Sequence, residues 1–397
     1  MKKSCFPNLP LASALFIVLA ISILSGCEKQ DDGLPSSTAV TPGQPVAASI
    51  PKNIDPLTVP ADNPMTPEKI ALGRHLFFDK ALSVDKSTSC GSCHQVNHGF
   101  SDIAATSTGM SQRHGTRNAP PLANVAYNTT FTWDGRFKSL EEHAPGPIFN
   151  SVEMGNNFST TSRDTVPNGY NSGPGPNDTN FLFKRLNNHE KDKAGKNYAD
   201  LFKEAWGSYA VGPDGVSLDH IAKSIACFER TIISTQTDFD RYNNGDQTVL
   251  KNNPQALAGL KLFTDVNGAN CISCHSGYNF TDQKFHDNGI GTNQVGDKGQ
   301  FNVTNDPKDV RKFKTPSLRN IALTAPYMHD GRFSTLQDVL ANYNKGGNDK
   351  SSTHDALIKP LNLSETDMAN IIEFLKTLSD NNFVTDKASK YSNPWNN

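Results

Sequence analysis

The chain has 397 residues, of which 36% are hydrophobic and 20% are charged, a composition typical of a globular protein with two or three domains. Its 38 Lys and Arg residues nearly balance its 40 Asp and Glu residues, and the net charge of −2 argues against a nucleic-acid binder. The one long apolar stretch lies at the N-terminus, which excludes a membrane protein with several spans.

The chain begins with the pattern of an export signal. Two lysines precede an apolar run over 11–24, which is shorter than the roughly 20 residues that a membrane-spanning helix needs. The run ends in Leu-Ser-Gly-Cys27, which resembles a bacterial lipobox, so we expect 1–26 to be a signal peptide and Cys27 to carry lipid. Ordinary secretion with cleavage nearby is the alternative. Residues 27–60 are rich in Pro, Ser, Thr and Gly and are expected to tether the protein on the periplasmic side of the cell envelope.

Helix signals dominate the rest of the chain and strand signals are weak, so we expect an all-α fold with long loops. Thr66-Pro-Glu opens one helix with proline in its first turn, and Ser364 opens another. Between them, Cys227 lies on an apolar helical pattern within 218–234 and is expected to be a buried thiol. The stretch 155–198 is rich in Asn, Gly and Ser and is expected to be a surface loop.

Four of the seven cysteines belong to two copies of one pentapeptide. The copies are Cys90-Gly-Ser-Cys93-His94 and Cys271-Ile-Ser-Cys274-His275. In Cys-x-x-Cys-His the two thiols attach to the vinyl groups of haem c, and the histidine becomes an axial ligand of the iron. A zinc cluster would need another ligand nearby, and local disulfides would not require a histidine in both copies. We therefore expect two covalently bound haem c groups, with His94 and His275 as proximal ligands.

The two haem motifs lie in an internal repeat. The matched segments are Gly73-x-x-Leu-Phe-x-Asp with Gly259-x-x-Leu-Phe-x-Asp, and residues 120–142 with residues 316–338. Within the second pair, Trp133-Asp-Gly-Arg-Phe corresponds to His329-Asp-Gly-Arg-Phe. We therefore expect two small helical haem domains that arose by duplication, over 61–236 and 237–380, followed by a tail over 381–397.

A tyrosine in the second half raises the question of iron ligation. A helix that Thr335 caps carries Tyr343 on its apolar face, and two glycines end this helix. An inward phenol needs a partner for its oxygen, and haem iron or a backbone group would serve. The residue pattern alone favours the backbone partner. The answer matters because an iron with two protein ligands carries electrons, whereas an open iron can bind peroxide.

The sequence is similar to the bacterial dihaem cytochrome c peroxidase family, which includes the MauG-type enzymes. The similarity extends from Ala71 to about Leu378. Besides the haem motifs, it rests on Gly115-Thr-Arg-Asn-Ala-Pro120, Trp133-Asp-Gly-Arg136, Ser151-Val-Glu-Met154 and Leu323-Thr-Ala-Pro-Tyr-Met-His-Asp-Gly331. The resemblance implies two cytochrome-c-like domains with a calcium ion between them. It also implies that the N-terminal haem reacts with peroxide and that the C-terminal haem accepts electrons from a small donor protein.

The resemblance assigns roles to individual positions. Glu153 matches the acid/base above the peroxidatic iron, where a carboxylate can move a proton from hydrogen peroxide to the leaving hydroxide. Trp133 matches the tryptophan between the two haems, which implies an electron relay. Asn118, Thr324 and Pro326 match the ligands of the calcium ion, which prefers oxygen donors.

Tyr343 matches the sixth ligand of the second haem, which is Met in ordinary peroxidases and Tyr in MauG-type members. The resemblance therefore reverses the preference for a backbone partner, and we expect Tyr343 to bind iron. An anionic phenolate stabilises ferric over ferrous iron and lowers the reduction potential relative to Met. The MauG-type enzymes use this property to oxidise side chains of a partner protein.

The first half departs from the family pattern at two positions. Where peroxidases that need reductive activation carry a displaceable histidine, this chain has Met110, with His114 four residues further on. Either would close the first iron, but we expect this iron to be five-coordinate and open. His143 stands where the family has Gln, and its ordinary pKa would let it change charge near neutral pH and share proton handling with Glu153.

Three functions remain in competition. The first is reduction of hydrogen peroxide with electrons from a small cytochrome c or cupredoxin, and the second is MauG-like oxidation of Trp or Tyr in a partner protein. The third is electron transport without catalysis, which would need neither Glu153 nor Trp133. Tyr343 raises the second relative to the first, but family prevalence keeps the peroxidase ahead. The sequence leaves the donor and the oligomeric state open, a homodimer included.

Overall fold

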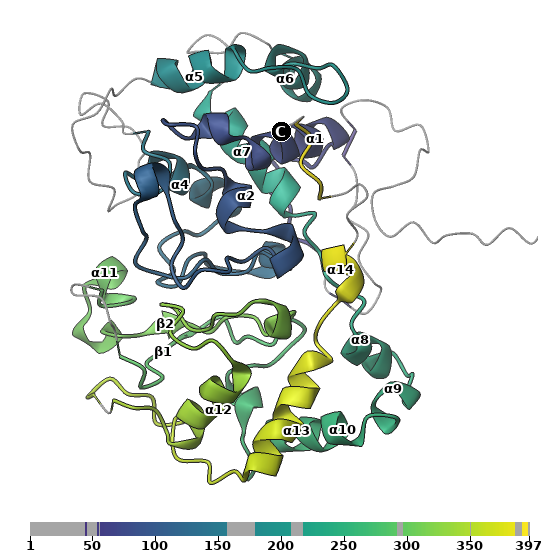
Figure 1. Cartoon of the computed structure of the whole chain (residues 1–397), viewed down its shortest axis with the longest axis vertical. Helices are drawn as coiled ribbons and strands as arrows, with labels where there is room; N and C mark the ends of the chain where they lie inside the picture. The colour runs from purple at the N-terminus through teal and green to yellow at the C-terminus, as the bar shows by residue number, and fades with distance from the viewer. Residues whose placement is uncertain are drawn as a thin grey trace, which may run out of the picture.

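The computed structural model describes residues 44–45, 54, 56–156, 179–207, 217–291, 297–349, 351–385 and 391–395. The expected signal peptide, Cys27 and most of the expected tether lie outside these residues. Among the described helices, none is long and apolar enough to cross a membrane. The described chain forms two helical lobes, the first above the second in Figure 1.

The elements of each lobe follow one another along the chain. The first lobe contains α1 (Pro67–Phe78), α2 (Cys90–Cys93), α3 (Leu140–His143), α4 (Pro145–Phe149), α5 (Thr179–Asn187), α6 (Tyr198–Trp206) and α7 (Leu218–Glu229). The second contains α8 (Asp238–Asn243), α9 (Thr248–Lys251), α10 (Pro254–Thr264), α11 (Phe301–Thr304), α12 (Leu336–Asn344) and α13 (Glu365–Lys376), and α14 (Asn381–Thr385) follows. Within the described residues, the strands are β1 (Phe285–His286) and β2 (Phe313–Lys314), which pair antiparallel. The mostly helical architecture confirms the expected fold class.

Each lobe is built on a close crossing of two helices, α1 with α7 and α10 with α13. Glycine permits both crossings. A Cβ added to Gly73 would stand 1.9 Å from the carbonyl oxygen of Ser224, and one added to Gly259 would stand 1.9 Å from that of Asn370. The matched glycines of the repeat therefore perform the same packing task in both lobes, since any side chain would push the helices apart.

The expected helix starts are confirmed. The Thr66 hydroxyl accepts the backbone N–H of Lys69 at the start of α1. At the start of α13, Ser364 and Asp367 form a reciprocal capping box. α7 ends at Glu229, five residues before the expected end at 234, because the β-branched residues that follow it disfavour helix.

The expected loop over 155–198 is partly helical. Residues 157–178 lie outside the described part of the chain, but α5 follows them. Leu182 and Leu186, one helical turn apart, are fully buried in the first lobe. The Arg185 side chain donates to the carbonyl oxygen of Ala81 at 2.9 Å. A short amphipathic helix therefore covers the core where composition suggested only a loop.

The C-terminal tail returns from the second lobe to the first. α14 lies between the lobes, and the end of the chain lies beside α1 in Figure 1. Tyr391 and Trp395 are 4% and 2% exposed within the first lobe. The Trp395 indole N–H donates to the carbonyl oxygen of His75 at 3.0 Å, and the Tyr391 hydroxyl donates to that of Thr231 at 2.8 Å. The two lobes are therefore linked twice by the same chain.

Buried ion pairs also join the lobes. The Arg117 guanidinium of the first lobe lies 2.6 Å from an oxygen of Asp134 and 2.7 Å from an oxygen of Asp297, which belongs to the second lobe. Arg136 makes a further pair with Asp134 at 2.8 Å. Removing one member would leave a buried charge without its partner, so this network fixes how the lobes sit together.

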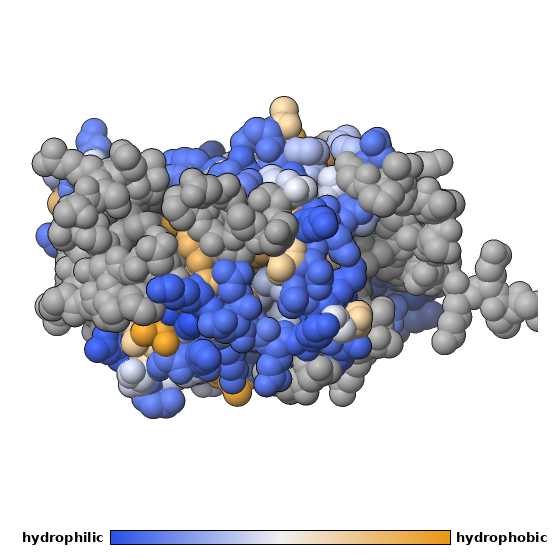
Figure 2. Space-filling model, turned by 90° about the horizontal axis from the view of Figure 1, so that it is seen from above, coloured by the Kyte–Doolittle hydropathy of each residue, from blue (hydrophilic) through white to orange (hydrophobic). Residues whose placement is uncertain are grey.

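The outer face of the first lobe is mainly hydrophilic where it is described, as Figure 2 shows.

Candidate haem sites

Both pentapeptides present their cysteines for attachment. Cys90 and Cys93 lie at the two ends of the one-turn helix α2, and Cys271 opens a matching turn of 3-10 helix. These thiols and that of Cys274 are free. Burial raises the pKa of Cys93 to about 11 and that of Cys271 to about 12, so both thiols are neutral and suit apolar surroundings. Two free thiols three positions apart, followed by histidine, fit the attachment of haem c.

The two motif histidines have the same orientation. Nδ1 of His94 donates to the carbonyl oxygen of Phe100 at 3.0 Å, and Nδ1 of His275 donates to that of Phe280 at 2.9 Å. A carbonyl can only accept, so the proton sits on Nδ1 and the lone pair of Nε2 faces away, available to a metal. Burial lowers the pKa of both histidines, which keeps the rings neutral as ligands must be. Both donor sets therefore fit an axially bound haem iron.

Glu153 lies beside the first haem motif, within electrostatic reach of Cys90 and Cys93. Asn150 holds it: its Nδ2 donates to Oε1 of Glu153 at 2.8 Å, and its Oδ1 accepts the backbone N–H of Val152 at 2.8 Å. Burial raises the pKa of Glu153 to about 7. A carboxyl group with this pKa can both accept and release a proton at neutral pH. Sequence reasoning missed Asn150, whose role depends on the local turn.

His143 ends α3 and lies within electrostatic reach of His94. Its ring stacks on Phe131 with a centroid distance of 6.2 Å and meets Phe137 edge-on at 5.2 Å. Burial, together with the charges of His94 and Arg136, lowers the pKa of His143 to about 4. The expectation that His143 changes charge near neutral pH is therefore corrected: the ring is neutral there and offers a hydrogen bond rather than a proton.

The loop that carries Met110 is folded onto the Glu153 turn. The Met110 backbone N–H donates to the carbonyl oxygen of Glu153 at 2.8 Å. A Cβ added to Gly155 would stand 1.9 Å from the Met110 sulfur, so the thioether lies directly against this glycine. His114 is exposed, with its Nδ1 3.4 Å from the hydroxyl of Thr108. Met110 and His114, the two candidate ligands of the first iron, therefore both contact other residues of the protein.

Trp133 is buried where the two lobes meet. Its indole N–H donates to the carbonyl oxygen of Asn118 at 2.9 Å, and its ring meets His329 edge-on at a centroid distance of 6.5 Å. His329 in turn stacks on Phe313 at 3.7 Å. Two matching backbone hydrogen bonds join these segments. The Asn118 N–H donates to the carbonyl oxygen of His329 at 2.7 Å, and the Lys314 N–H donates to that of Trp133 at 2.8 Å. An unbroken chain of aromatic contacts therefore crosses the interface.

The three residues expected to bind calcium lie at this interface. Asn118, Thr324 and Pro326 line one cavity together with Trp133. The Asn118 side-chain nitrogen donates to the backbone carbonyls of residues 104 and 105 at 3.1 and 3.2 Å, which turns Oδ1 away from that loop. An amide oxygen and backbone carbonyls are donors that suit a hard cation, so the residues fit Ca²⁺.

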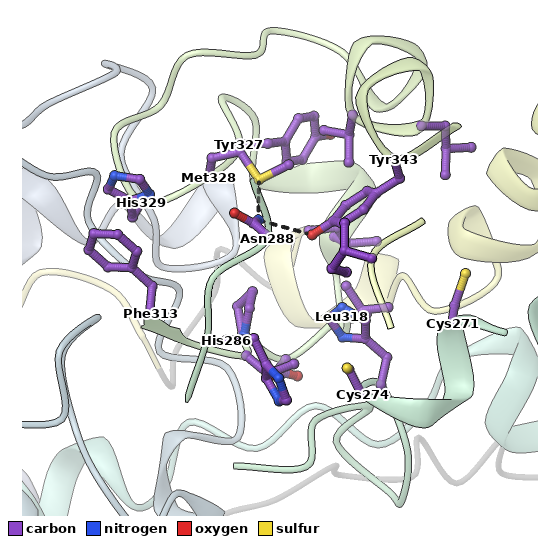
Figure 3. Close-up of a pocket in the computed structure, with 18 of the residues that line it drawn as sticks. Cys271, Cys274, His286, Asn288, Phe313, Leu318, Tyr327, Met328, His329 and Tyr343 are labelled. Carbon is purple, nitrogen blue, oxygen red and sulfur yellow. Dashed lines mark hydrogen bonds between the residues drawn. The ribbon is translucent and has the colours of Figure 1, made fainter. Parts of the chain in front are cut away.

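That cavity adjoins the second haem motif. It is lined by Cys271, Cys274 and His275 and by apolar side chains, among them Leu318, Leu336, Val339, Leu340 and Leu361. Tyr343 of α12 points into it, as Figure 3 shows. Its hydroxyl accepts a hydrogen bond of 3.2 Å from Asn288, and burial raises its pKa. Large, apolar and bordered by the attachment residues, this cavity fits a haem.

A cluster of Cys274, Asp282 and His286 borders the same cavity. One atom each of Cys274, Asp282 and His286 lie within 4.8 Å of one another, as metal ligands would. Cys274 belongs to the attachment motif, however, and its sulfur is taken up in a thioether once haem is bound. His286 lies between two carboxylates, 2.6 Å from Asp355 and 3.0 Å from Asp282. We therefore assign this cluster to the haem surroundings rather than to a separate metal.

Comparisons with known proteins agree with this geometry. Residues 67–248 match the family described as di-haem cytochrome c peroxidase, and residues 256–379 match cytochrome c. The chain is 36% identical over 348 residues to the methylamine utilization protein MauG of Methylorubrum extorquens, covering 87% of this chain and 88% of the relative. It is 33% identical over 357 residues to cytochrome-c peroxidase IdrP1 of Denitromonas iodatirespirans, covering 82% and 85%. The solved structure of a MauG-like protein associated with microbial copper homeostasis matches with a TM-score of 0.74 and 30% identity, covering 87% of this chain and 99% of that one.

Proposed function

Because the chain belongs to the di-haem cytochrome c peroxidase family, we propose that it reduces hydrogen peroxide to water at the first haem site with electrons that enter through the second. Relatives named cytochrome-c peroxidase support this activity. The observation that carries the proposal is the carboxyl group of Glu153, which Asn150 holds beside the first haem motif and whose pKa burial raises to about 7. Cys90, Cys93 and His94 would hold the haem, which supplies electrons to the O–O bond when bound.

The side chains around this site would handle the proton. Glu153 would take a proton from one peroxide oxygen and deliver it to the other, which could then leave as water while the haem supplies the electrons. Asn150 orients the carboxylate for both transfers through the bond to Oε1. The neutral ring of His143 offers a hydrogen bond to the second oxygen, and Phe131 and Phe137 exclude bulk water on its other sides.

Electrons would reach this site through the second one. His275 and Tyr343 are the proposed axial ligands of the second iron, and the contact of Trp133 with His329 supports a relay between the sites. Asn118 would hold a calcium ion at the interface together with the backbone carbonyls of Thr324 and Pro326, and the bound ion would stiffen the relay. We further propose a small redox protein as the electron donor and lipid at Cys27 as the anchor in the cell envelope.

MauG-like oxidation of a partner protein is the second candidate function. Two observations favour it: Tyr343 lines the cavity beside the second haem motif, and the chain is 36% identical to a relative named methylamine utilization protein MauG. A phenolate ligand favours high iron oxidation states, which suits the withdrawal of electrons from Trp or Tyr side chains. Chemical change in a co-purified partner after peroxide treatment would distinguish this function from simple peroxide reduction.

Steady-state turnover of hydrogen peroxide by the holoprotein, with a reduced small cytochrome c as donor, tests the proposal. Glu153→Gln keeps the shape and the bond from Asn150 but cannot carry the proton, so turnover should fall by about 100-fold or more. Glu190→Gln, at an exposed carboxylate of the same lobe, is the matched control and should leave turnover unchanged. An equal rate in the wild type and Glu153→Gln would remove Glu153 from the mechanism, and a wild type without turnover would favour an electron carrier.

A further inference from the structure

Asn288 lies between Tyr343 and Met328 in the cavity beside the second haem motif, as Figure 3 shows. Its Nδ2 is 3.2 Å from the hydroxyl oxygen of Tyr343 and 3.9 Å from the sulfur of Met328. All three residues line the cavity that also contains His275. One amide group therefore contacts the phenol oxygen that we propose as an iron ligand.

We propose that Asn288 is a positioning residue that donates a hydrogen bond to the iron-binding oxygen of Tyr343 and thereby raises the reduction potential of the second haem. This inference rests on the proposed function, because it requires Tyr343 as a ligand. A phenolate oxygen stabilises ferric iron by donating electron density. An N–H donor at the same oxygen withdraws part of that density, so ferric iron is stabilised less and the iron is easier to reduce.

The orientation of the Asn288 amide is set by its other end. Oδ1 accepts the backbone N–H of Ile290 at 3.4 Å. The two remaining neighbours, the oxygen of Tyr343 and the sulfur of Met328, are both acceptors when Tyr343 is a phenolate, so they require the NH₂ end of the amide. The NH₂ group therefore points at Tyr343 when the phenol is ionised, as an iron ligand would be.

A buried carboxylate holds the loop that carries Asn288. Asp287 is 1% exposed, and its Oδ2 accepts the hydroxyl groups of Ser351 and Thr353 at 2.7 and 2.8 Å. Its Oδ1 accepts the backbone N–H of Gly289 at 3.1 Å. With residues on both sides bonded to one carboxylate, the backbone at Asn288 has little freedom to turn its side chain away.

The same loop is joined to the segment that follows the Tyr343 helix. The backbone N–H groups of Asn348 and Asp349 both donate to the carbonyl oxygen of Gly289, at 2.9 and 2.8 Å. A Cβ added to Gly347 would stand 2.9 Å from the carbonyl oxygen of Asn288, so these two backbones are in direct contact. The distance between Asn288 and Tyr343 is therefore fixed by the fold rather than by the side chains alone.

Redox titration of the holoprotein, with EPR of the ferric second haem, tests the inference. Asn288→Leu removes the donor at similar volume, and we expect a lower reduction potential and shifted g values, because the phenolate then donates more strongly. Asn288→Asp keeps the shape but loses the donor. It should lower the potential further, because a carboxylate adds negative charge beside the phenolate. Asn288→Asp also tests the inference if Asn288→Leu does not fold. Asn302→Leu is the matched control, since it makes the same replacement at an exposed asparagine of the same lobe and should leave potential and g values as in the wild type.

The outcomes separate this inference from the proposed function. Tyr343→Phe should abolish the wild-type ferric signal of the second haem, and a signal that survives would remove Tyr343 as a ligand. If Tyr343→Phe abolishes the signal but neither Asn288 variant shifts the potential, the ligand stands and the role of Asn288 is overturned. A shift in Asn302→Leu as large as that in Asn288→Leu would also overturn it, since the effect would then not depend on the bond to Tyr343.

Discussion

Trp133 and His329, which occupy the same position in the two halves of the repeat, meet edge-on where the lobes join, with their ring centroids 6.5 Å apart. The backbone carbonyl of each residue accepts a hydrogen bond from the opposite half of the repeat. The Lys314 N–H donates to Trp133, and the Asn118 N–H donates to His329. Burial lowers the pKa of His329 to about 4, so the pair is a neutral aromatic contact at physiological pH. Duplication has thus produced an internal interface in which equivalent residues face each other.

Replacement of this tryptophan should slow electron flow without changing the chemistry at the first site. In Trp133→Leu, we expect steady-state turnover with a donor to fall, because electrons must cross a gap without the aromatic ring. The bimolecular reaction of peroxide with the ferric protein, followed by stopped-flow absorbance, should keep its wild-type rate. Trp133→Phe retains a ring and should recover part of the turnover, whereas equal loss in both kinetic steps would mean that Trp133 only supports the structure.

The peroxide reaction should depend on pH through Glu153. Burial raises the pKa of this carboxyl group to about 7, and only its ionised form can take the proton of peroxide. The second-order rate constant should therefore rise as pH increases and reach half its maximum close to pH 7. In Glu153→Gln this rise should disappear along with most of the rate. A wild-type profile that is flat across this range would assign the proton to another group.

A second buried carboxyl group should govern the pH dependence of stability. Glu229 is 5% exposed, its Oε2 lacks a hydrogen-bond partner among the described residues, and burial raises its pKa to about 8. The unfolded chain releases this proton near pH 4, at about the ordinary pKa of Glu, so the stability that the neutral group contributes is full below about pH 4 and is lost as pH rises to about 8.

Glu229→Gln should therefore be more stable relative to the wild type at about pH 9 than at about pH 5, with a difference on the order of 1 kcal/mol or more. Urea unfolding at both pH values measures it. Glu190→Gln, at an exposed carboxylate, should show no such change. A gain for Glu229→Gln that is equal at both pH values would show that Glu229 keeps an ordinary pKa in the folded protein.

The returning tail should contribute strongly to the stability of the first lobe. Trp395 is buried against His75, His189 and Tyr198, with ring centroids 5.0, 4.1 and 5.2 Å away. Trp395→Ala should therefore lower the free energy of unfolding by about 3 kcal/mol or more. Val266→Ala, at an exposed apolar side chain, should change it little. An unchanged denaturation midpoint for Trp395→Ala would mean that the tail is not part of the folded core.

Local patterns predicted the parts of the molecule that depend on neighbouring residues. The caps at Thr66 and Ser364 form within one helical turn, so the sequence contains all of their partners. The duplicated Gly73 and Gly259 could be recognised by alignment of the chain with itself. Only the fold, however, reveals which backbone carbonyl each glycine approaches.

Contacts between distant segments could not be predicted in the same way. Asn288 meets Tyr343 across 55 positions, and nothing in the surrounding sequence marks an asparagine as a partner of a phenol. The neutral state of His143 depends on burial and on the charges of His94 and Arg136, and Trp395 of the tail bonds to His75 across 320 positions. These features follow from burial and packing, which the linear pattern does not contain.

The most direct test of the account is rapid mixing of the ferric holoprotein with one equivalent of hydrogen peroxide, without prior reduction. We predict that the absorbance of the first haem changes in a second-order reaction, and that Glu153→Gln slows this reaction by about 100-fold or more. A ferric protein whose spectrum peroxide leaves unchanged would contradict an open first haem beside a proton-transferring carboxylate.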